Sequence, residues 1–150
     1  KSSLAMFLAE VLSHLLHEDE ANPGLYDFIS GELTNLDSAD EGLGNFHLLF
    51  LYKLMDHLGF APENPGSHPV FDLMNGVYLK ESPPHPHFLN EQETFSWKNL
   101  HQASGKNEMK MSIGRNERAD LLTALLTYYR LHVKDFGTLR SLSILKELLS

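Results

Sequence analysis

The chain contains no cysteine, which excludes disulfide bonds, thiolate metal sites and cysteine nucleophiles. It has no apolar run near the roughly 20 residues that a membrane-spanning helix needs, so the sequence predicts no membrane partner. The start shows no basic segment followed by an apolar run and a small-residue cleavage site, the pattern of a signal peptide. With 42% hydrophobic residues, the composition is that of a globular protein, and we expect a cytoplasmic one.

Positive charge is scarce and unevenly placed. The chain has 12 Lys and Arg against 20 Asp and Glu, for a formal net charge of −8. Residues 1–105 carry four basic and fifteen acidic residues, which gives them a net charge of −11. Residues 106–150 carry eight basic and five acidic residues, which gives them a net charge of +3. Such asymmetry indicates a local interaction surface, although Lys and Arg also serve simply to solvate exposed helix faces.

Motifs of common enzymes are missing. The chain has no Gly-x-Ser-x-Gly elbow, no phosphate-binding loop and no His-Glu-x-x-His pair. His14 and His17 flank the acidic run 18–20, but such charge runs are usually solvated helix ends. We therefore expect no catalytic residues and no enzymatic activity.

Apolar residues recur at helical spacing along most of the chain. Leu33 and Phe95 fall on the apolar stripes of two of these segments, and the last long segment opens at Ser112 or Asn116. Start and stop signals support the pattern: Asn22-Pro23 opens one helix, Gly59 ends another, and Asn90 with Glu93 is spaced like a capping box. The expected helices cover about residues 3–16, 23–36, 45–58, 90–104 and 116–134, with a last helix from Thr138 or Ser141 to Leu149.

Residues 60–90 differ from the rest because they hold six of the seven prolines. Within them, Asn75-Gly76 separates two short apolar runs, which is a strong hairpin signal. The sequence thus predicts a mainly α protein with a single helical domain over 1–150. This domain is a bundle of about six helices with a small β-hairpin insertion near residues 70–80.

Histidines in this insertion offer one alternative function. His68, His85 and His87 could supply three imidazoles to zinc, iron or manganese, as in a metal-binding helical protein or a metal-dependent enzyme. The flanking prolines explain exposed, loop-borne histidines without a metal, and no carboxylate has a diagnostic spacing. We therefore assign no metal ligand and no cofactor.

The basic end favours a partner-binding function. Arg130, Lys134 and Arg140 bracket a turn at residues 135–137, and Lys146 follows in the last expected helix. Cations at the rim of an apolar groove accept a peptide that combines carboxylates with an aromatic or aliphatic anchor. Binding of nucleic acid is an alternative in which Tyr128 would stack bases, but the acidic remainder of the chain would repel phosphates.

Five short segments together resemble the C-terminal helical domain of the bacterial recombination mediator family RecO. Their order and spacing over nearly all 150 residues carry the resemblance. One of them, Leu58-Gly59-Phe60-Ala61-Pro62, is like the family's Leu-Gly-Tyr-x-Pro. The segments are residues 5–12, 22–28, 46–50, 58–62 and the run from Tyr129-Arg130-Leu131-His132 to Leu139-Arg140-Ser141-Leu142.

This resemblance implies a non-enzymatic role in DNA repair and homologous recombination. Family members help load recombinase onto single-stranded DNA, and they work with RecR and with the acidic C-terminal tail of single-strand binding protein. Many carry a four-cysteine zinc module where this chain has the cysteine-free residues 63–89, so the chain is similar to a zinc-less branch. The family's N-terminal oligonucleotide-binding barrel, which makes most of the contact with single-stranded DNA, is absent, so we expect the chain to be a piece of a longer protein.

Overall fold

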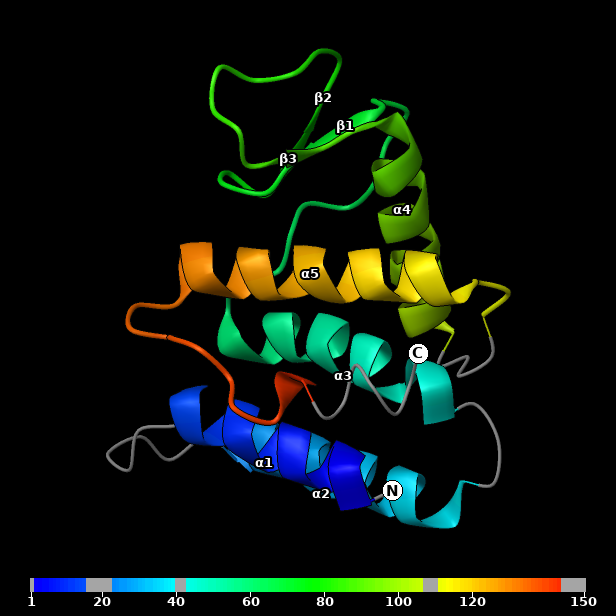
Figure 1. The fold of residues 1–150 in the computed structure, drawn as a ribbon, viewed down its shortest axis with the longest axis vertical. Coiled ribbons are helices and arrows are strands. Elements are labelled where there is room, and N and C mark those ends of the chain that lie inside the picture. The colour runs from blue at the N-terminus through cyan, green and yellow to red at the C-terminus, as the bar shows by residue number, and fades with distance from the viewer. Residues whose placement is uncertain (1, 16–22, 40–42, 107–110, 144–150) are drawn as a thin grey trace.

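The computed structural model describes residues 2–15, 23–39, 43–106 and 111–143 (Figure 1). These ranges form a mainly helical fold with a small antiparallel sheet, which confirms the expected class. The expected last helix, from Thr138 or Ser141 to Leu149, extends beyond the described residues, which end at residue 143. The elements are α1 (Ser2–Leu15), α2 (Pro23–Ser38), α3 (Leu43–Leu58), β1 (Val70–Asp72), β2 (Val77–Leu79), β3 (Phe88–Leu89), α4 (Glu91–Gly105) and α5 (Arg115–His132).

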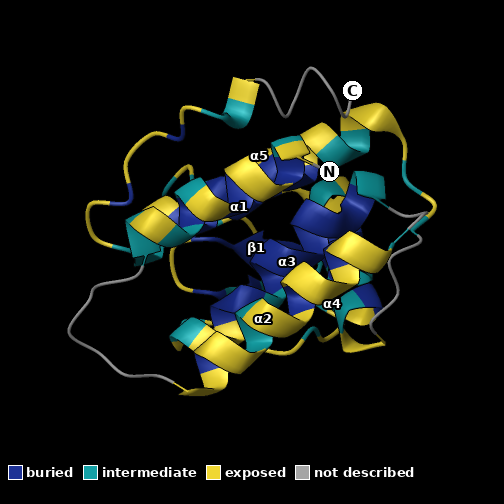
Figure 2. Cartoon of the chain, turned by 90° about the horizontal axis from the view of Figure 1, so that it is seen from below, coloured by how far each residue is buried: buried dark blue, intermediate teal, exposed yellow. Residues whose placement is uncertain are grey.

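The helix α3 forms the centre of the core. Every residue from 45 to 52 is buried, and a helix that is covered on all sides belongs in the interior. Figure 1 shows α5 beside α3, with α1 and α2 on one side of this pair and α4 with the sheet on the other. Figure 2 shows the buried α3 behind α1 and α2, whose outer faces are exposed. The core reaches across these layers, since the Tyr129 hydroxyl donates to the Leu51 carbonyl at 2.6 Å.

On α2, the buried face is shifted by one residue from the sequence prediction. Leu33 was expected in the core but is 43% exposed, whereas Glu32 is only 7% exposed. The reason is an ion pair with α3, in which Lys53 Nζ lies 2.6 Å from Glu32 Oε1. A paired carboxylate tolerates burial that an unpaired one would not.

The start of α4 is a confirmed capping box. The Asn90 side chain accepts a hydrogen bond from the Glu93 N–H at 2.8 Å, and the Glu93 carboxylate accepts one from the Asn90 N–H at 3.0 Å. Trp97 is fully buried, as expected, but Phe95 is 65% exposed, so its predicted core position was wrong. The helix instead turns Thr94 toward the sheet.

Thr94 joins the sheet to α4. Its Oγ1 accepts a hydrogen bond from the Phe71 N–H and donates one to the Leu89 carbonyl, both at 3.0 Å. Because both atoms of this hydroxyl are used in a fully buried place, Thr94 fixes β1 and β3 against the first turn of α4.

The hairpin is confirmed, with a longer turn than predicted. β1 and β2 are antiparallel with Phe71 opposite Tyr78, and four residues, 73–76, connect them. β1 ends early because the Asp72 carboxylate accepts hydrogen bonds from the N–H groups of Met74 and Asn75. Gly76 supplies the positive φ of 69° that closes the turn.

A third strand was missed by the sequence analysis. β3 pairs with β1 in the order β2-β1-β3, with Phe71 opposite Leu89. At two residues, β3 is too short for an alternating pattern to be recognised. Its place is set by its neighbours, because the Leu73 N–H donates to the His87 carbonyl just before it at 3.0 Å.

α5 is the longest described helix, with 18 residues. Its cap position is held by Gly114, which makes no side-chain cap bond, so neither expected cap residue, Ser112 or Asn116, is used. Within the described ranges, neither α5 nor any other helix is long and apolar enough to cross a membrane.

Candidate functional site

The predicted turn at the end of α5 is present and firmly packed. The last helical hydrogen bond runs from the Val133 N–H to the Tyr129 carbonyl at 2.8 Å. Asp135 and Gly137 then take positive φ angles of 60° and 74°. Between them, the buried Phe136 ring packs on Tyr129 with the ring centroids 5.5 Å apart. Residues 133–140, which we name the cationic loop, therefore lead from the end of α5 to α1 (Figure 1).

α1 holds the cationic loop through Glu10. One carboxylate oxygen accepts the Arg140 N–H at 2.7 Å, and the other accepts the Ser141 N–H at 2.8 Å and the Ser141 hydroxyl at 2.7 Å. The Ser141 N–H is the main cause that lowers the pKa of Glu10, and burial opposes it only in part. The carboxylate thus acts as a cap supplied by a distant helix.

His14 makes a second attachment, one turn further along α1. Its Nδ1 bonds to the Phe136 carbonyl, and because a carbonyl only accepts, this nitrogen carries the proton. The His14 and Phe136 rings also meet edge to face, 5.8 Å apart. The sequence pattern indicates a solvated helix end at His14, whereas the structure packs its ring on the loop. His17 lies outside the described residues.

The structure brings three of the four predicted partner-binding residues to this loop. Arg130 is exposed, and its Nε donates a long hydrogen bond of 3.4 Å to the Gly137 carbonyl. Lys134 and Arg140 expose their side chains from the loop itself. In the described part of the chain, none of the three forms an ion pair. Lys146 lies outside the described residues.

Apolar side chains lie next to these cations. Leu131, Val133 and Leu142 pack against the core but remain partly exposed. The cations are recognisable in the sequence, but Glu10 and His14, which position the loop, are not. No local pattern marks them, because their partners follow more than 120 residues later.

The histidines of the insertion take other roles than the metal ligands of the alternative hypothesis. His85 Nε2 lies 3.0 Å from Asp72 Oδ1, and its Nδ1 accepts the His87 N–H at 3.0 Å. The main chain of His68 accepts a hydrogen bond from Lys98. Among the described residues, no three His, Asp or Glu side chains gather closely enough to hold a metal ion.

Asp72 is the centre of this insertion. Burial alone would raise its pKa, but contacts from Asn75 and His85 outweigh burial and hold the pKa below its usual value. The Asn75 side chain donates to Asp72 Oδ2 at 2.8 Å. The carboxylate therefore ties the turn at residues 73–76 to the loop that carries His85.

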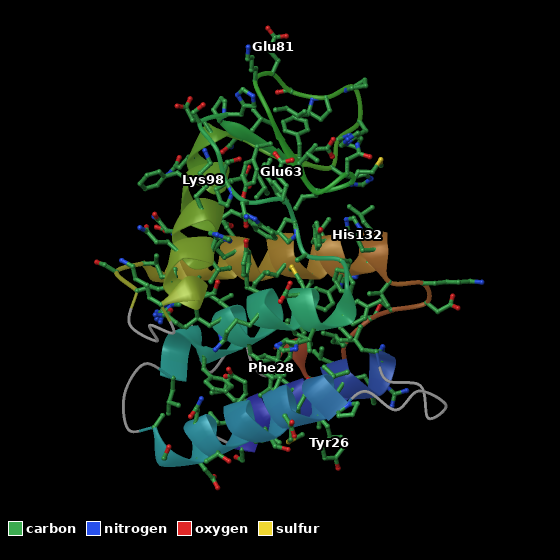
Figure 3. All side chains as sticks on the ribbon, turned by 180° about the vertical axis from the view of Figure 1, so that it is seen from behind. Tyr26, Phe28, Glu63, Glu81, Lys98 and His132 are labelled. Atoms are coloured by element: carbon green, nitrogen blue, oxygen red, sulfur yellow. The ribbon has the colours of Figure 1, made fainter. Side chains whose placement is uncertain are left out.

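Tyr128 is not available to stack on a nucleic acid base, contrary to the nucleic-acid alternative. It is buried, its hydroxyl donates to the Phe60 carbonyl at 2.6 Å, and burial raises its pKa to about 12. Its ring lies 4.0 Å from that of His132, whose Nε2 donates to the Leu73 carbonyl at 2.8 Å. Figure 3 shows His132 on the side of α5 that faces the sheet. This part of α5 therefore serves to support the insertion.

Fold and site together define a mainly helical domain that carries a small antiparallel sheet and an exposed cationic loop. Residues 1–64 match the family model described as recombination protein O C terminal. The chain is 34% identical to the DNA repair protein RecO of Azobacteroides pseudotrichonymphae over 97% of this chain and 61% of that protein. The RecO of Phocaeicola vulgatus is 36% identical over 100% of this chain and 63% of that protein, and the RecO of Flavobacterium psychrophilum is 35% identical over 100% and 62%.

The chain is therefore similar over nearly its whole length to RecO DNA repair proteins, and its residues 1–64 match the C-terminal family model. This confirms the resemblance seen in the sequence. The chain spans about three-fifths of the length of the curated relatives that it matches. No solved structure matches it significantly.

Proposed function

We propose that this domain is a non-enzymatic docking module of a recombination mediator, and that its cationic loop receives an acidic partner. The proposal rests on the positions and the contacts of Arg130, Lys134 and Arg140. They lie on or over one segment that is fixed to α1, and none of the three pairs with a described carboxylate. The similarity to DNA repair proteins supports this role.

The partner that best suits the loop is the C-terminal tail of single-strand binding protein, which is acidic and ends in an apolar residue. Guanidinium groups form strong hydrogen bonds with carboxylates, and a fixed loop loses little entropy when the tail binds. The partly exposed Leu131, Val133 and Leu142 offer contacts to the apolar end. Lys146 would add a fourth cation. RecR is the second proposed partner, and single-stranded DNA would be held mainly by the N-terminal part of a complete mediator.

A peptide titration tests this proposal. A fluorescent acidic peptide that ends in Pro-Phe is added to the 150-residue chain, and anisotropy is followed at low and at physiological salt. We expect saturable binding with a Kd on the order of micromolar, weakened by salt because the cations are exposed. A peptide that lacks the terminal Phe should bind much more weakly.

Two controls separate a specific site from general charge attraction. A scrambled peptide of the same charge should bind less well than the native order at both salt concentrations. Equal binding of the scrambled peptide, or no binding of either, would reject the tail as partner and leave RecR to be tested by the same titration.

A further inference from the structure

A groove of about 400 Å³ opens between α2, α3 and the end of α4. The segment after α3, at residues 61–64, lines it as well. Side chains that are far apart in the sequence, from Phe28 to Gly105, therefore meet in one concave place. Ligands commonly bind where a few polar groups converge in such a hollow. The groove is separate from the cationic loop, which contributes no residue to its lining.

An aromatic stack forms part of the wall of this groove. The His57 ring lies on the Phe28 ring with the centroids 4.2 Å apart and the planes 20° apart. Phe28 in turn stacks on the buried Phe50, with the centroids 5.6 Å apart. Figure 3 shows Phe28 on the side of α2 that faces α3. Because Phe28 is partly exposed and His57 is exposed, the stack runs from the core to solvent, and a flat ligand group can extend it.

The charged residues of the groove leave one carboxylate over. Its acids are Glu32 and Asp56, and its only lysine is Lys53. Lys53 Nζ lies 2.6 Å from Glu32 Oε1, so these two charges compensate each other. Asp56 is exposed and belongs to neither ion pair found in the described ranges. The net charge of the groove is therefore the negative charge of Asp56.

Two further features of the groove favour a positive ligand. α4 ends here, so the negative end of its dipole lies at the groove, and the last turn of this helix contains no basic residue. His101 also lines the groove, with its Nδ1 2.8 Å from the Tyr52 hydroxyl, and burial lowers its pKa. His101 is therefore neutral at pH 7 and does not repel a cation.

We propose that this groove binds an arginine side chain of a partner protein. A guanidinium is planar, so it can stack on the His57 ring while it donates two parallel hydrogen bonds to the Asp56 carboxylate. A lysine ammonium would use the carboxylate but not the stack. The charge of −11 on residues 1–105 attracts a basic protein segment and opposes a nucleic acid backbone.

This proposal is independent of the docking function of the cationic loop. The loop is basic and suits an acidic tail, whereas the groove is acidic and suits a basic segment, so the two sites take different partners. Failure of one test leaves the other proposal in place.

The first test compares N-acetyl-arginine amide with N-acetyl-citrulline amide, in which a neutral urea of nearly the same shape replaces the guanidinium. Each is added to the 150-residue chain at constant ionic strength, and NMR follows the backbone amides of Asn64 and Gly105, which line the groove. We expect the arginine probe to move both resonances saturably, with a Kd on the order of ten millimolar. The citrulline probe should leave them in place. N-acetyl-lysine amide should bind roughly threefold more weakly than the arginine probe, because it cannot stack.

Variants then identify the two contacts. Asp56→Asn keeps the shape but removes the charge, and it should weaken binding of the arginine probe roughly tenfold. His57→Ala removes the outer ring of the stack and should weaken binding roughly threefold. Both residues are exposed, so both variants are expected to fold. Asp27→Asn is the matched control, because Asp27 is an exposed acid of α2 that does not line the groove, and it should bind like the parent chain.

Any of four results would overturn the proposal. Equal shifts with the arginine and citrulline probes would mean a polar contact that does not need a cation. Equal affinity for the arginine and lysine probes would mean a general cation site without stacking. Unchanged binding in Asp56→Asn would remove Asp56 as the anion. Tighter binding of adenosine than of the arginine probe would assign the aromatic stack to a nucleic acid base.

Discussion

The carboxylate of Glu10 accepts hydrogen bonds from both the backbone N–H and the hydroxyl of Ser141, a residue 131 positions later in the chain. This contact closes the fold, because it ties the segment after α5 to the first helix. The same carboxylate also accepts the N–H of the preceding residue, Arg140, and so sets the path of the cationic loop. The first helix is thus part of the proposed docking site without itself carrying the cations.

Replacement of Glu10 should loosen this attachment. Glu10→Gln keeps the shape but offers one acceptor oxygen in place of two, so we expect a loss of about 1 kcal/mol in the free energy of unfolding. Urea unfolding followed by circular dichroism measures it. Asp27→Asn is the control, because Asp27 is an exposed acid of α2 that forms no hydrogen bond or ion pair with a described side chain. Equal effects of the two changes would show that Glu10 does not hold the loop.

The same carboxylate gives stability a dependence on pH. The pKa of Glu10 is lowered from 4.5 in the folded chain, so the folded state binds fewer protons than the unfolded state near that pH. Its contribution should be fully present above about pH 5 and should be lost as the pH falls through the folded pKa. The difference in unfolding free energy between the parent chain and Glu10→Gln should therefore shrink from pH 7 to pH 3. A constant difference would contradict the lowered pKa.

Local signals made much of the fold predictable. The capping box of Asn90 and Glu93, Pro23 at a helix start and Gly59 at a helix end each act through neighbours within a few residues, and each is confirmed. The turn at residues 135–137 was predictable for the same reason, since Gly137 takes the positive φ that glycine favours.

Long-range partners were not predictable from the sequence. Glu32 is buried where Leu33 was expected because Lys53, 21 residues later, reaches it. β3 forms because β1 offers it a free edge, and Thr94 faces inward because two strands present their backbone groups to it. In each case, a contact between distant segments overrides a local pattern.

Thr94 should therefore be important for stability. Thr94→Val keeps the shape but leaves the Phe71 N–H buried without an acceptor, and we expect a loss of about 1–3 kcal/mol in the free energy of unfolding. Thr123→Val is a matched control, because its exposed hydroxyl only donates to the Ala119 carbonyl one turn earlier in α5. A similar small effect of both changes would mean that the sheet is not fixed to α4 through this hydroxyl.

His47 should stay neutral far below the usual pKa of histidine. Burial, followed by the charge of Arg118, lowers its pKa from 6.5 to about 4. The unfolded chain takes up this proton near pH 6.5 and the folded chain does not, so stability should fall between pH 7 and pH 4, by as much as about 3 kcal/mol. NMR titration of the imidazole gives the pKa directly. A midpoint near 6.5 would show that His47 is open to solvent.

Arg140 provides the sharpest test of the proposed docking function. Its backbone is held by Glu10 while its side chain is exposed, so a change of the side chain should leave the loop in place. We expect Arg140→Gln and Arg140→Glu to weaken binding of the acidic peptide by about 1.5–3 kcal/mol, the loss of a charge-assisted contact. This corresponds to a Kd raised roughly 10- to 150-fold in the anisotropy titration.

Arg115→Glu makes the same change of charge at the other end of α5, and it separates a local contact from a general effect of net charge. If the loop is the docking site, this variant should bind the peptide with nearly the affinity of the parent chain at physiological salt, where charges more than about 8 Å apart are screened. If the changes at Arg140 and Arg115 weakened peptide binding equally, the peptide would be held by long-range charge attraction and not by contacts with the loop. Unchanged affinity in both Arg140 variants would remove this residue from the site.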